Sequence, residues 1–497
     1  MSVPRVVISA PSSGHGKTAV SVGLLAALRA RGLAAAGFKI GPDHIDAAYL
    51  GLAAGVPGRN LDPRLTPVTQ LGPLFRYGAR GADVAVLEGT MGLYDGLAGR
   101  TDVESTAQVA GLLRAPVVLV VDVAAMGQSV AALVHGFRAY DELLWLGGVI
   151  LNRVVSDRHE QVLRESLDDL GVPVLGAVRR RALTVALPPR AAGVVPVLHG
   201  SVDAAQTVRR LGEAIADGVD LDRLLALARS APALTAEPWS PRAALGQAVP
   251  DGEPVPAGRA VPPWAGPRPA ALADDPAELV DDPAERTADL RGGPVIAVAG
   301  TAAGGYGYAE AVELLAAAGA QPVPVDPLRD DRLPAGTRGL VLGGAIPEAY
   351  LDEIGANVTL LAAIRALATA GYPVLAEGSG LVLLAREVDG RVMAGVLPTS
   401  ARLAGHIIHG YRHAVTRSAS PLLPTGTALV GHRSHRAVCT PRAGVAPAYS
   451  WQDGAPEGFV QGNVFASLLC AHWAGVPAVA AHLVESARGG ADLRVAS

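Results

Sequence analysis

Two long segments of the chain alternate short apolar runs with longer amphipathic ones. In the first segment, from residue 5 to about 230, four apolar runs predict buried strands: Arg5–Ala10, Ala82–Leu87, Pro116–Val123 and Gly147–Leu151. The stretch Thr18–Arg31 predicts a helix that ends at Gly32. Strands buried on both faces and separated by helices are typical of a parallel sheet covered on both sides. The pattern therefore predicts an α/β domain.

The same alternation returns at Val295. Strands are predicted by VIAVAG from residue 295, GLVLGG at 339–344 and PVLAEG at 373–378, and helices by the stretches at about 309–318 and 356–370. This segment predicts a second, smaller α/β domain.

Residues 231–294 interrupt the alternation. They contain 13 of the 38 prolines, many alanines and clustered acids, but few large apolar residues. Such a segment buries too little apolar surface to order itself, which favours an extended linker. We therefore predict an N-terminal domain over 1–230, a Pro/Ala-rich linker over 231–293 and a C-terminal domain over 294–497.

Composition narrows the class of protein. The chain has 497 residues, of which 50% are hydrophobic and 18% charged, and this balance is typical of folded globular proteins. The net charge of −4 provides no basic excess for binding nucleic acid. The two cysteines, Cys439 and Cys470, exclude a disulfide framework. Without a signal-peptide pattern or an apolar run of about 18 residues, we expect a soluble cytoplasmic protein with no membrane partner.

The clearest chemical signal lies between the first predicted strand and helix, in the sequence APSSGHGKT at residues 10–18. It resembles a phosphate-binding P-loop, although Pro11 stands where a strict motif has glycine. Glycines let backbone N–H groups approach phosphate oxygens, a lysine reaches the outer phosphates and a threonine hydroxyl can bind Mg²⁺. The residues assigned to ATP here are Gly14, His15, Gly16, Lys17 and Thr18. An ordinary glycine-rich turn is the alternative.

Lysine is nearly absent from the chain. Only Lys17 and Lys39 are lysines, against 40 arginines. Both fall in the first 40 residues, among the other signals for phosphate chemistry. An ammonium is a compact charge that a planar guanidinium cannot replace in a tight phosphate site. We take both lysines as candidate phosphate ligands, with chance placement as the alternative.

Three polar clusters follow at positions where doubly wound folds place ligands. They are FKIGPDHID at 38–46, RNLD at 59–62 and EGTMGLYDG at 88–96. Glu88 directly ends an apolar strand, as expected for a metal-binding acid of a nucleotide site. Asp43 and Asp46 could hold Mg²⁺ or position a substrate carboxyl group. In the alternative, Asp43 is a turn residue after Gly-Pro and Asp46 is a helix cap, which is plausible for one of them but less so for both.

These motifs, together with ILNRV at 150–154, closely resemble the cobyrinic or hydrogenobyrinic acid a,c-diamide synthases of cobalamin biosynthesis. The resemblance covers nearly the whole chain outside the linker. It implies a dethiobiotin-synthetase-like P-loop domain followed by a flavodoxin-like domain of the class I glutamine amidotransferase type. The implied reaction is ATP-dependent amidation of the a and c carboxylates of a corrinoid through an acyl phosphate. It also implies a homodimer.

The resemblance also assigns roles to residues. Lys17 and Lys39 would bind phosphates, and Mg²⁺ would be held by Thr18, Asp46 and Glu88. Asp43 and Asp95 would place the corrinoid carboxylate. Asn152 and Arg153 would contact the adenine end of the nucleotide. His44 stands where the family often has tyrosine.

The C-terminal domain departs from the family in its chemistry. A glutaminase of this type needs a cysteine nucleophile on a sharp strand-to-helix turn, in a segment such as Ala-Glu-Cys-Gly-Gly-Leu. This chain reads AEGSGL at 376–381, which places Gly378 at the cysteine's position. Ser379 lies one residue on and would point elsewhere. Gly344 belongs to a segment like the family's oxyanion-hole loop, Gly343-Gly344 followed by Pro347-Glu348.

Other positions agree with a degenerate glutaminase site. The family's Gly-His-Glu-Phe-His segment appears here as Gly431-His-Arg-Ser-His435. His472 could be the remnant of a cysteine–histidine pair, or a buried histidine without a catalytic duty. Neither Cys439 nor Cys470 is expected on the strand-to-helix turn. We predict that the protein does not hydrolyse glutamine and takes ammonia from solution or from another subunit.

Two other functions stay open at this point. The chain could be an amide synthetase for a different polycarboxylate, or a noncatalytic paralogue that binds nucleotide for regulation. The sequence does not distinguish a cobalt-containing from a cobalt-free corrin, nor does it say which arginines bind the substrate carboxylates.

Overall fold

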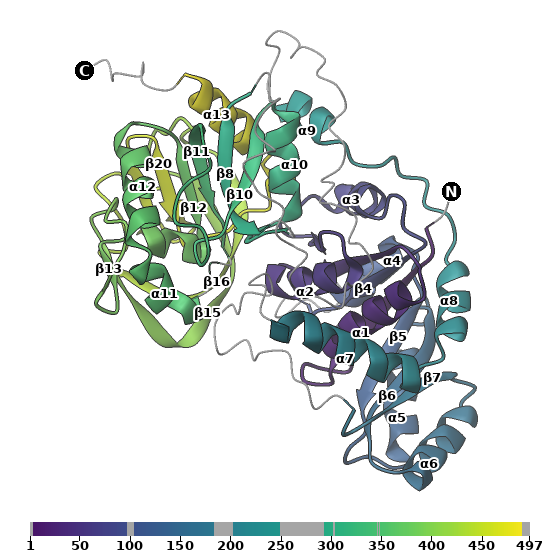
Figure 1. The fold of residues 1–497 in the computed structure, drawn as a ribbon. Helices are drawn as coiled ribbons and strands as arrows, with labels where there is room; N and C mark the ends of the chain where they lie inside the picture. Colours follow the sequence, from purple (N-terminus) through teal and green to yellow (C-terminus); the bar gives the residue numbers. More distant parts are fainter. Residues whose placement is uncertain are drawn as a thin grey trace. The chain divides into compact units, whose positions relative to one another are not determined.

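The structure is a computed structural model that describes residues 3–96, 104–182, 202–248, 293–301, 304–344, 346 and 348–489. The chain divides into two compact units, residues 1–240 and 241–497. Each unit contains a sheet with helices packed on it, as the alternating pattern predicts; the sheet of the first unit is parallel and that of the second is mixed (Figure 1). No helix in these described ranges is both long enough and apolar enough to cross a membrane.

The first unit is built on a seven-stranded sheet with the order β3-β2-β4-β1-β5-β6-β7, in which all paired strands are parallel. Its strands are β1 (Arg5–Ser9), β2 (Ala35–Ile40), β3 (Arg59–Leu61), β4 (Val84–Glu88), β5 (Val117–Asp122), β6 (Leu146–Val154) and β7 (Val174–Arg179). Its helices are α1 (Lys17–Ala30), α2 (His44–Ala54), α3 (Leu71–Gly78), α4 (Thr106–Leu112), α5 (Ser129–Tyr140), α6 (Asp157–Asp168), α7 (Val202–Gly218) and α8 (Leu221–Arg229), with a 3₁₀ turn, η1, at Val68–Gln70.

Helices cover both faces of this sheet, because its strands are mostly apolar and their residues are largely buried. The helices α1, α2, α7 and α8 share one continuous core with the strands, and Leu24, Leu50 and Leu224 are completely buried in it. On the side of α3, Phe75 packs against Phe38 of β2 with ring centroids 5.1 Å apart. Such two-sided burial fixes the carboxyl ends of the strands, where the connecting loops carry the polar motifs.

The second unit contains a sheet with the order β10-β8-β11-β12-β20-β19, to which β9 adds beside β8. Its strands are β8 (Val295–Thr301), β9 (Gly304–Gly305), β10 (Gln321–Val325), β11 (Thr337–Leu342), β12 (Val374–Glu377), β19 (Phe459–Gln461) and β20 (Val464–Ser467). The helices of this unit are α9 (Pro241–Ala248), α10 (Ala309–Ala317), α11 (Leu351–Ala356), α12 (Val358–Thr369) and α13 (Ala478–Arg488), with 3₁₀ segments η5 (Glu348–Tyr350), η6 (Gly378–Leu384) and η7 (Trp473–Gly475).

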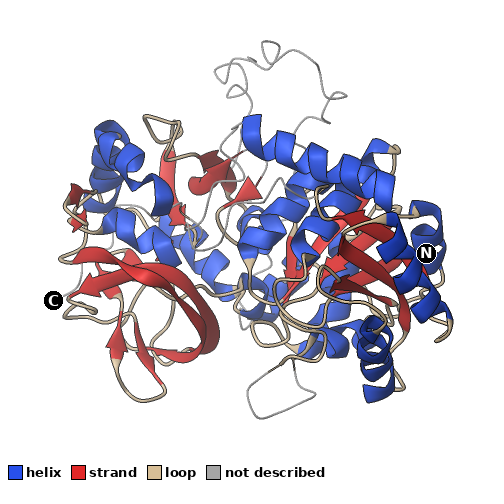
Figure 2. Cartoon of the chain, turned by 90° about the horizontal axis from the view of Figure 1, so that it is seen from below, coloured by secondary structure: helices blue, strands red, loops and turns tan. Residues whose placement is uncertain are grey.

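The alternating pattern did not predict the second sheet of this unit. It consists of β13 (Glu387–Val388), β14 (Arg391–Val392), β15 (Ser400–Thr416), β16 (Ala428–Thr440), β17 (Tyr449–Trp451) and β18 (Pro456–Glu457). The long strands β15 and β16 pair antiparallel, with a register shift between Leu403 and Ile408. Figure 2 shows these long bent strands in red. Their sequence mixes polar and apolar residues because much of this sheet is exposed, so no clean apolar run marks it.

The described structure reaches into the segment predicted as a linker. Trp239 is buried, its backbone N–H donates to Pro73 O, and its ring lies edge-on to that of Tyr77 at 5.2 Å. Pro241–Ala248 forms α9. The rest of the predicted linker, up to residue 292, lies outside the described residues. The predicted domain boundaries at 230 and 293 stay a prediction.

Candidate active site

The loop between β1 and α1 has the conformation that a phosphate site needs. Gly14 and Gly16 both adopt positive φ, +92° and +93°, so backbone N–H groups can turn inward where a side chain would be strained. Gly16 precedes the first residue of α1, and no side chain caps this helix. The Lys17 side chain is buried, and its Nζ donates to Ser12 O at 3.0 Å. The N-terminus of the helix and a buried ammonium therefore face the same loop.

Asn152 and His15 join this loop to the neighbouring strands. Asn152, at the end of β6, donates from Nδ2 to His15 O at 2.8 Å. His15 Nδ1 accepts from the backbone N–H of Asp122 at 2.8 Å. The pKa of His15 is lowered, chiefly by burial and then by Lys17 and Arg153, although Asp122 opposes the shift. A neutral imidazole suits this accepting role.

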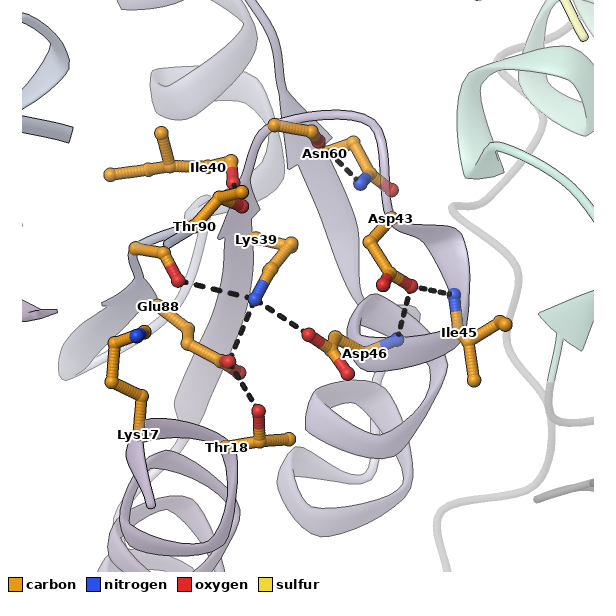
Figure 3. A network of polar contacts seen from close by, with 12 residues as sticks. Lys17, Thr18, Lys39, Ile40, Asp43, Ile45, Asp46, Asn60, Glu88 and Thr90 are labelled. Carbon is orange, nitrogen blue, oxygen red and sulfur yellow. Dashed lines mark hydrogen bonds and ion pairs between the residues drawn. The ribbon is translucent and has the colours of Figure 1, made fainter. Parts of the chain in front are cut away.

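Strand register brings Lys39 and Glu88 together. The strands β2 and β4 are parallel neighbours in which Lys39 pairs with Glu88, and both side chains are buried. Lys39 Nζ lies 2.7 Å from Glu88 Oε1 and donates to Gly89 O at 3.2 Å. Thr18 Oγ1, at the start of α1, donates to the same Glu88 oxygen at 2.6 Å (Figure 3). Three chain segments that are far apart in sequence therefore meet at one carboxylate.

The two acids of the motif at 38–46 have different positions. Asp46 is buried and lies 2.6 Å from Lys39 Nζ through Oδ2, so Lys39 bridges two carboxylates. Asp43 is the N-cap of α2, and its Oδ1 accepts from the backbone N–H groups of Ile45 and Asp46 at 2.9 and 3.0 Å (Figure 3). The alternative that made Asp46 the helix cap is therefore wrong, because Asp43 caps the helix while Asp46 joins the charged cluster.

The donor set fits a magnesium ion bound together with nucleotide phosphates. Mg²⁺ prefers oxygen ligands and is usually held by one or two carboxylates, waters and substrate phosphates. Thr18 and Glu88 supply a hydroxyl and a carboxylate. Glu88 Oε2 is buried and has no hydrogen-bond partner among the described residues, so one oxygen is left for a cation. Among the residues that the structure describes, no three His, Cys, Asp or Glu side chains form a metal site made of protein ligands alone.

The remaining predicted residues of this unit lie around the cluster. Asp95 accepts from the backbone N–H of Gly92 at 2.7 Å, so its carboxylate shapes its own loop. Arg153 adopts φ +62° and pairs with Asp122, leaving its side chain about half exposed. Sequence reasoning missed Asp122, although it ends the apolar strand β5 as Glu88 ends β4. The same signal would have found it.

The turn expected to carry a glutaminase nucleophile is present in the second unit. Strand β12 ends at Glu377, and η6 begins at Gly378, which has φ +53°. A sharp strand-to-helix turn with a residue at positive φ is the setting of a nucleophile elbow. Ser379 is buried, and its hydroxyl lies 2.9 Å from two backbone acceptors, Gly344 O and Ile346 O, to which it can donate. Ser379 is therefore held by the backbone rather than offered to a substrate. Pro347 lies outside the described residues.

Cys470 fills the place that a side chain at Gly378 would need. A Cβ atom built on Gly378 would lie 2.7 Å from Cys470 Sγ and 2.9 Å from Gly344 Cα. Burial raises the pKa of the Cys470 thiol well above its ordinary value, and Glu377 and Glu457 add to the shift. A neutral thiol is a weak nucleophile. Sequence reasoning placed Cys470 off the turn, which is right for its backbone, but did not predict that its sulfur lies against the turn.

His472 is completely buried. Its Nε2 lies 3.5 Å from Glu310 Oε2, and its ring lies 4.5 Å from that of Tyr308. These contacts hold the imidazole beside a carboxylate, as in a catalytic dyad or triad, but the chain offers no cysteine at residue 378 for it to activate.

The comparisons with known proteins cover both units. Residues 6–192 match the family described as CobQ/CobB/MinD/ParA nucleotide binding domain, and residues 297–476 match CobB/CobQ-like glutamine amidotransferase domain. The chain is 51% identical to the hydrogenobyrinate a,c-diamide synthase of Streptomyces coelicolor over 98% of both chains. It is 41% identical to that of Mycobacterium tuberculosis over 98% of both chains. It is 33% identical to the cobyrinate a,c-diamide synthase of a Synechococcus species, over 95% of this chain and 96% of the relative. With this identity over its whole length, the chain belongs to the family of hydrogenobyrinate and cobyrinate a,c-diamide synthases.

Proposed function

We propose that the protein amidates the a and c carboxylates of a corrinoid in an ATP-dependent reaction, with ammonia that it does not make from glutamine. Membership of the synthase family supports the substrate and the reaction. The observation that carries the chemistry is the cluster of Thr18, Lys39, Asp46 and Glu88 beside a P-loop.

A free carboxylate resists ammonia because oxide is a poor leaving group. In the proposed reaction a carboxylate oxygen of the substrate attacks the terminal phosphorus of ATP, and the bond from that phosphorus to the bridging oxygen breaks to release ADP. Ammonia then attacks the acyl carbon, inorganic phosphate leaves, and a proton is lost from nitrogen. Phosphoryl transfer of this kind depends mainly on positioning and on neutralising charge.

The residues of the first unit divide this work. Lys17 and Lys39 neutralise phosphate oxygens, and the backbone N–H groups around Gly14 and Gly16 hold the phosphates. Thr18 and Glu88, with Asp46 behind Lys39, would hold Mg²⁺, which supplies further charge neutralisation at the phosphates. His15, Asn152 and Arg153 would line the nucleoside side, and Asp43 and Asp95 would orient the substrate carboxyl group.

The second unit supports the choice of ammonia over glutamine. A glutaminase of this class needs a thiolate at the turn, and this chain has Gly378 there with Cys470 packed against it. Ammonia would come from solution or from another subunit.

The test is an assay with ATP, Mg²⁺ and hydrogenobyrinic acid, with ammonium or glutamine as the nitrogen donor. We expect the diamide with ammonium and none with glutamine. Lys17→Ala should reduce the ammonium-dependent rate at least about 100-fold, since it removes a charged phosphate ligand. Diamide formed from glutamine would contradict the role given to Gly378. ATP cleavage only with another polyacid would favour a different substrate, and nucleotide binding without turnover would favour a regulatory paralogue.

A further inference from the structure

The ammonium group of Lys39 spends its hydrogen bonds on the protein itself. Its Nζ lies 2.6 Å from Asp46 Oδ2 and 2.7 Å from Glu88 Oε1, and it donates to Gly89 O at 3.2 Å. An ammonium has three N–H donors, so each donor has an acceptor here. Figure 3 shows Lys39 between the two carboxylates. To bind a phosphate oxygen, Lys39 therefore has to give up at least one of these contacts.

The same contacts separate the Asp46 carboxylate from a metal ion. The Mg²⁺ ligands proposed above are Thr18, Asp46 and Glu88. Glu88 Oε2 has no hydrogen-bond partner among the described residues, whereas Asp46 Oδ2 is held by Lys39. A metal ion bound by both carboxylates needs the oxygen atoms that the ammonium now contacts. Lys39 and such an ion thus compete for one position.

Hydrogen bonds hold the backbone around this position. The strand β4, which ends at Glu88, pairs with β1 on one side and with β2 on the other. The connection from β2 to α2 is fixed by Asn60, whose Nδ2 donates to Gly41 O at 2.8 Å, and by Thr90, whose hydroxyl donates to the last carbonyl of β2. The flexible four-carbon side chain of Lys39 is therefore the part of the site that can move.

Burial and charge explain why the ammonium lies there when no nucleotide is bound. The side chains of Lys39, Asp46 and Glu88 are 2%, 6% and 0% exposed. Two carboxylates at this depth need a counter-ion, because an uncompensated buried charge is strongly destabilising. Lys39 supplies one positive charge against two negative ones, so the pair of carboxylates favours a cation of higher charge.

We propose that Lys39 occupies the cation position of the nucleotide-free site and leaves it when Mg²⁺ enters together with the nucleotide. The phosphates then give the ammonium new acceptors, and Asp46 and Glu88 exchange one positive charge for two. Without nucleotide the displaced ammonium has no such acceptor, so the protein binds Mg²⁺ weakly. The movement of Lys39 thus couples metal binding to nucleotide binding. This inference rests on the proposed function, which makes the ligands Mg²⁺ and a nucleotide.

Metal binding to the nucleotide-free, full-length protein tests this, with Mn²⁺ as the probe. Lys39→Met replaces the ammonium with an uncharged chain of similar length and keeps both carboxylates. We expect it to bind Mn²⁺ at least about tenfold more tightly than wild type, because a like charge a few ångströms away is removed. Electron paramagnetic resonance of free Mn²⁺ measures the affinity. The variant should also unfold at a lower temperature than wild type without metal, and regain stability with Mn²⁺.

Lys17→Met is the matched control, because it removes the same charge from the neighbouring loop, where Lys17 donates to Ser12 O. Its gain in Mn²⁺ affinity without nucleotide should not exceed about threefold, since the effect of a charge falls with distance. An equal gain in Lys17→Met and Lys39→Met would show that only the overall charge matters, and would overturn the inference.

The nucleotide-bound state can be tested in the wild type, because the chain has only two lysines. Nuclear magnetic resonance of isotope-labelled lysine side chains then reports on both, and Lys17→Met assigns the signals. We expect the Lys39 signal to stay unchanged with Mg²⁺ alone and to shift with Mg²⁺ and a non-hydrolysable ATP analogue together. A Lys39 signal unaltered by both would overturn the inference. These measurements contain no corrin or ammonia, so failure of the wild type to form the diamide would contradict the proposed function alone.

Discussion

At the scale of single residues, Gly378 and Cys470 are the pair on which the proposal that the second unit does not hydrolyse glutamine depends. Gly378 keeps the backbone conformation of the turn, and the sulfur of Cys470 takes the space beside it. The space that a side chain at residue 378 would need is therefore occupied by Cys470. A single substitution back to cysteine meets a neighbour within 2.7 Å of its Cβ atom.

We expect Gly378→Cys alone to give no glutaminase activity, and to form a disulfide with Cys470 under mild oxidation. The two sulfurs would be forced together, since a Cβ atom and the partner's sulfur lie about 3 Å apart in a disulfide. Thiol titration of the unfolded protein should find one thiol after oxidation instead of three. The matched control is Gly378→Cys with Cys470→Ala, which should retain its thiols. Hydrolysis of glutamine by the single variant would refute this account.

At the scale of elements, the β1–α1 loop depends on two glycines that differ in their surroundings. Both have nearly the same positive φ, but a Cβ atom on Gly16 would lie 2.3 Å from Asn152 Nδ2, whereas a Cβ atom on Gly14 meets no described atom within 4 Å. Both positions therefore require a backbone with positive φ, but only at Gly16 does another residue, Asn152, lie too close for a side chain.

Gly14→Ala should therefore cost about 1 kcal/mol of stability through backbone strain alone and leave nucleotide binding within a few-fold of wild type. Gly16→Ala should also displace Asn152 and weaken nucleotide binding by at least about tenfold. Equilibrium binding of ATP and thermal unfolding of both variants measure the difference. Equal affinities in the two variants would mean that contact with Asn152 does not set the shape of the loop.

The second sheet contains a buried acid that links stability to pH. Burial raises the pKa of Glu457 from 4.5 to about 7, although Ser467, Leu468, Arg433 and Arg442 oppose the shift. The folded state therefore holds a proton that the unfolded chain releases at lower pH. The stability contributed by that proton is fully present below pH 4.5 and is lost as the pH rises through 7.

Glu457→Gln should remove this dependence, since the amide keeps the shape without the charge. We expect the variant to unfold with a free energy greater than wild type by on the order of 1–3 kcal/mol at pH 8, and to differ little at pH 5. Denaturant unfolding at the two pH values measures this. A variant destabilised equally at pH 5 and pH 8 would show that the Glu457 side chain contributes to stability through its hydrogen bonds alone.

At the scale of the whole molecule, the two units differ in how far their chemistry is complete. The first unit assembles a charged cluster beside a P-loop, and the second matches a glutamine amidotransferase domain but has glycine at residue 378. If ammonia enters from solution, the rate of amidation depends on the concentration of neutral ammonia and not on that of the ammonium ion.

The rate at low total ammonium should consequently rise roughly tenfold per pH unit below the pKa of ammonium, because only neutral ammonia is nucleophilic. Initial rates at subsaturating ammonium, corrected for the rate at saturation, measure this. A rate independent of pH under these conditions would indicate that the ammonium ion itself is bound and deprotonated on the protein.

Much of the first unit was predictable because its strands are buried on both faces. Such strands appear in the sequence as continuous apolar runs. The polar residue at the end of each run lies at the carboxyl edge of the sheet, as Glu88 does at the end of β4. The sheet of β15 and β16 was not predictable in this way, since its exposed strands carry arginines and histidines among apolar residues. Asp43 as a cap and Asp46 in an ion pair could not be distinguished by spacing alone.

The sequence by itself determined the two α/β units, the P-loop and the glycine at residue 378, because local periodicity and residue type decide these properties. Only the tertiary structure decided that Lys39 bridges Asp46 and Glu88 and that Cys470 lies against the turn at Gly378. These contacts depend on strand register and on the packing of segments distant along the chain, which no local pattern encodes.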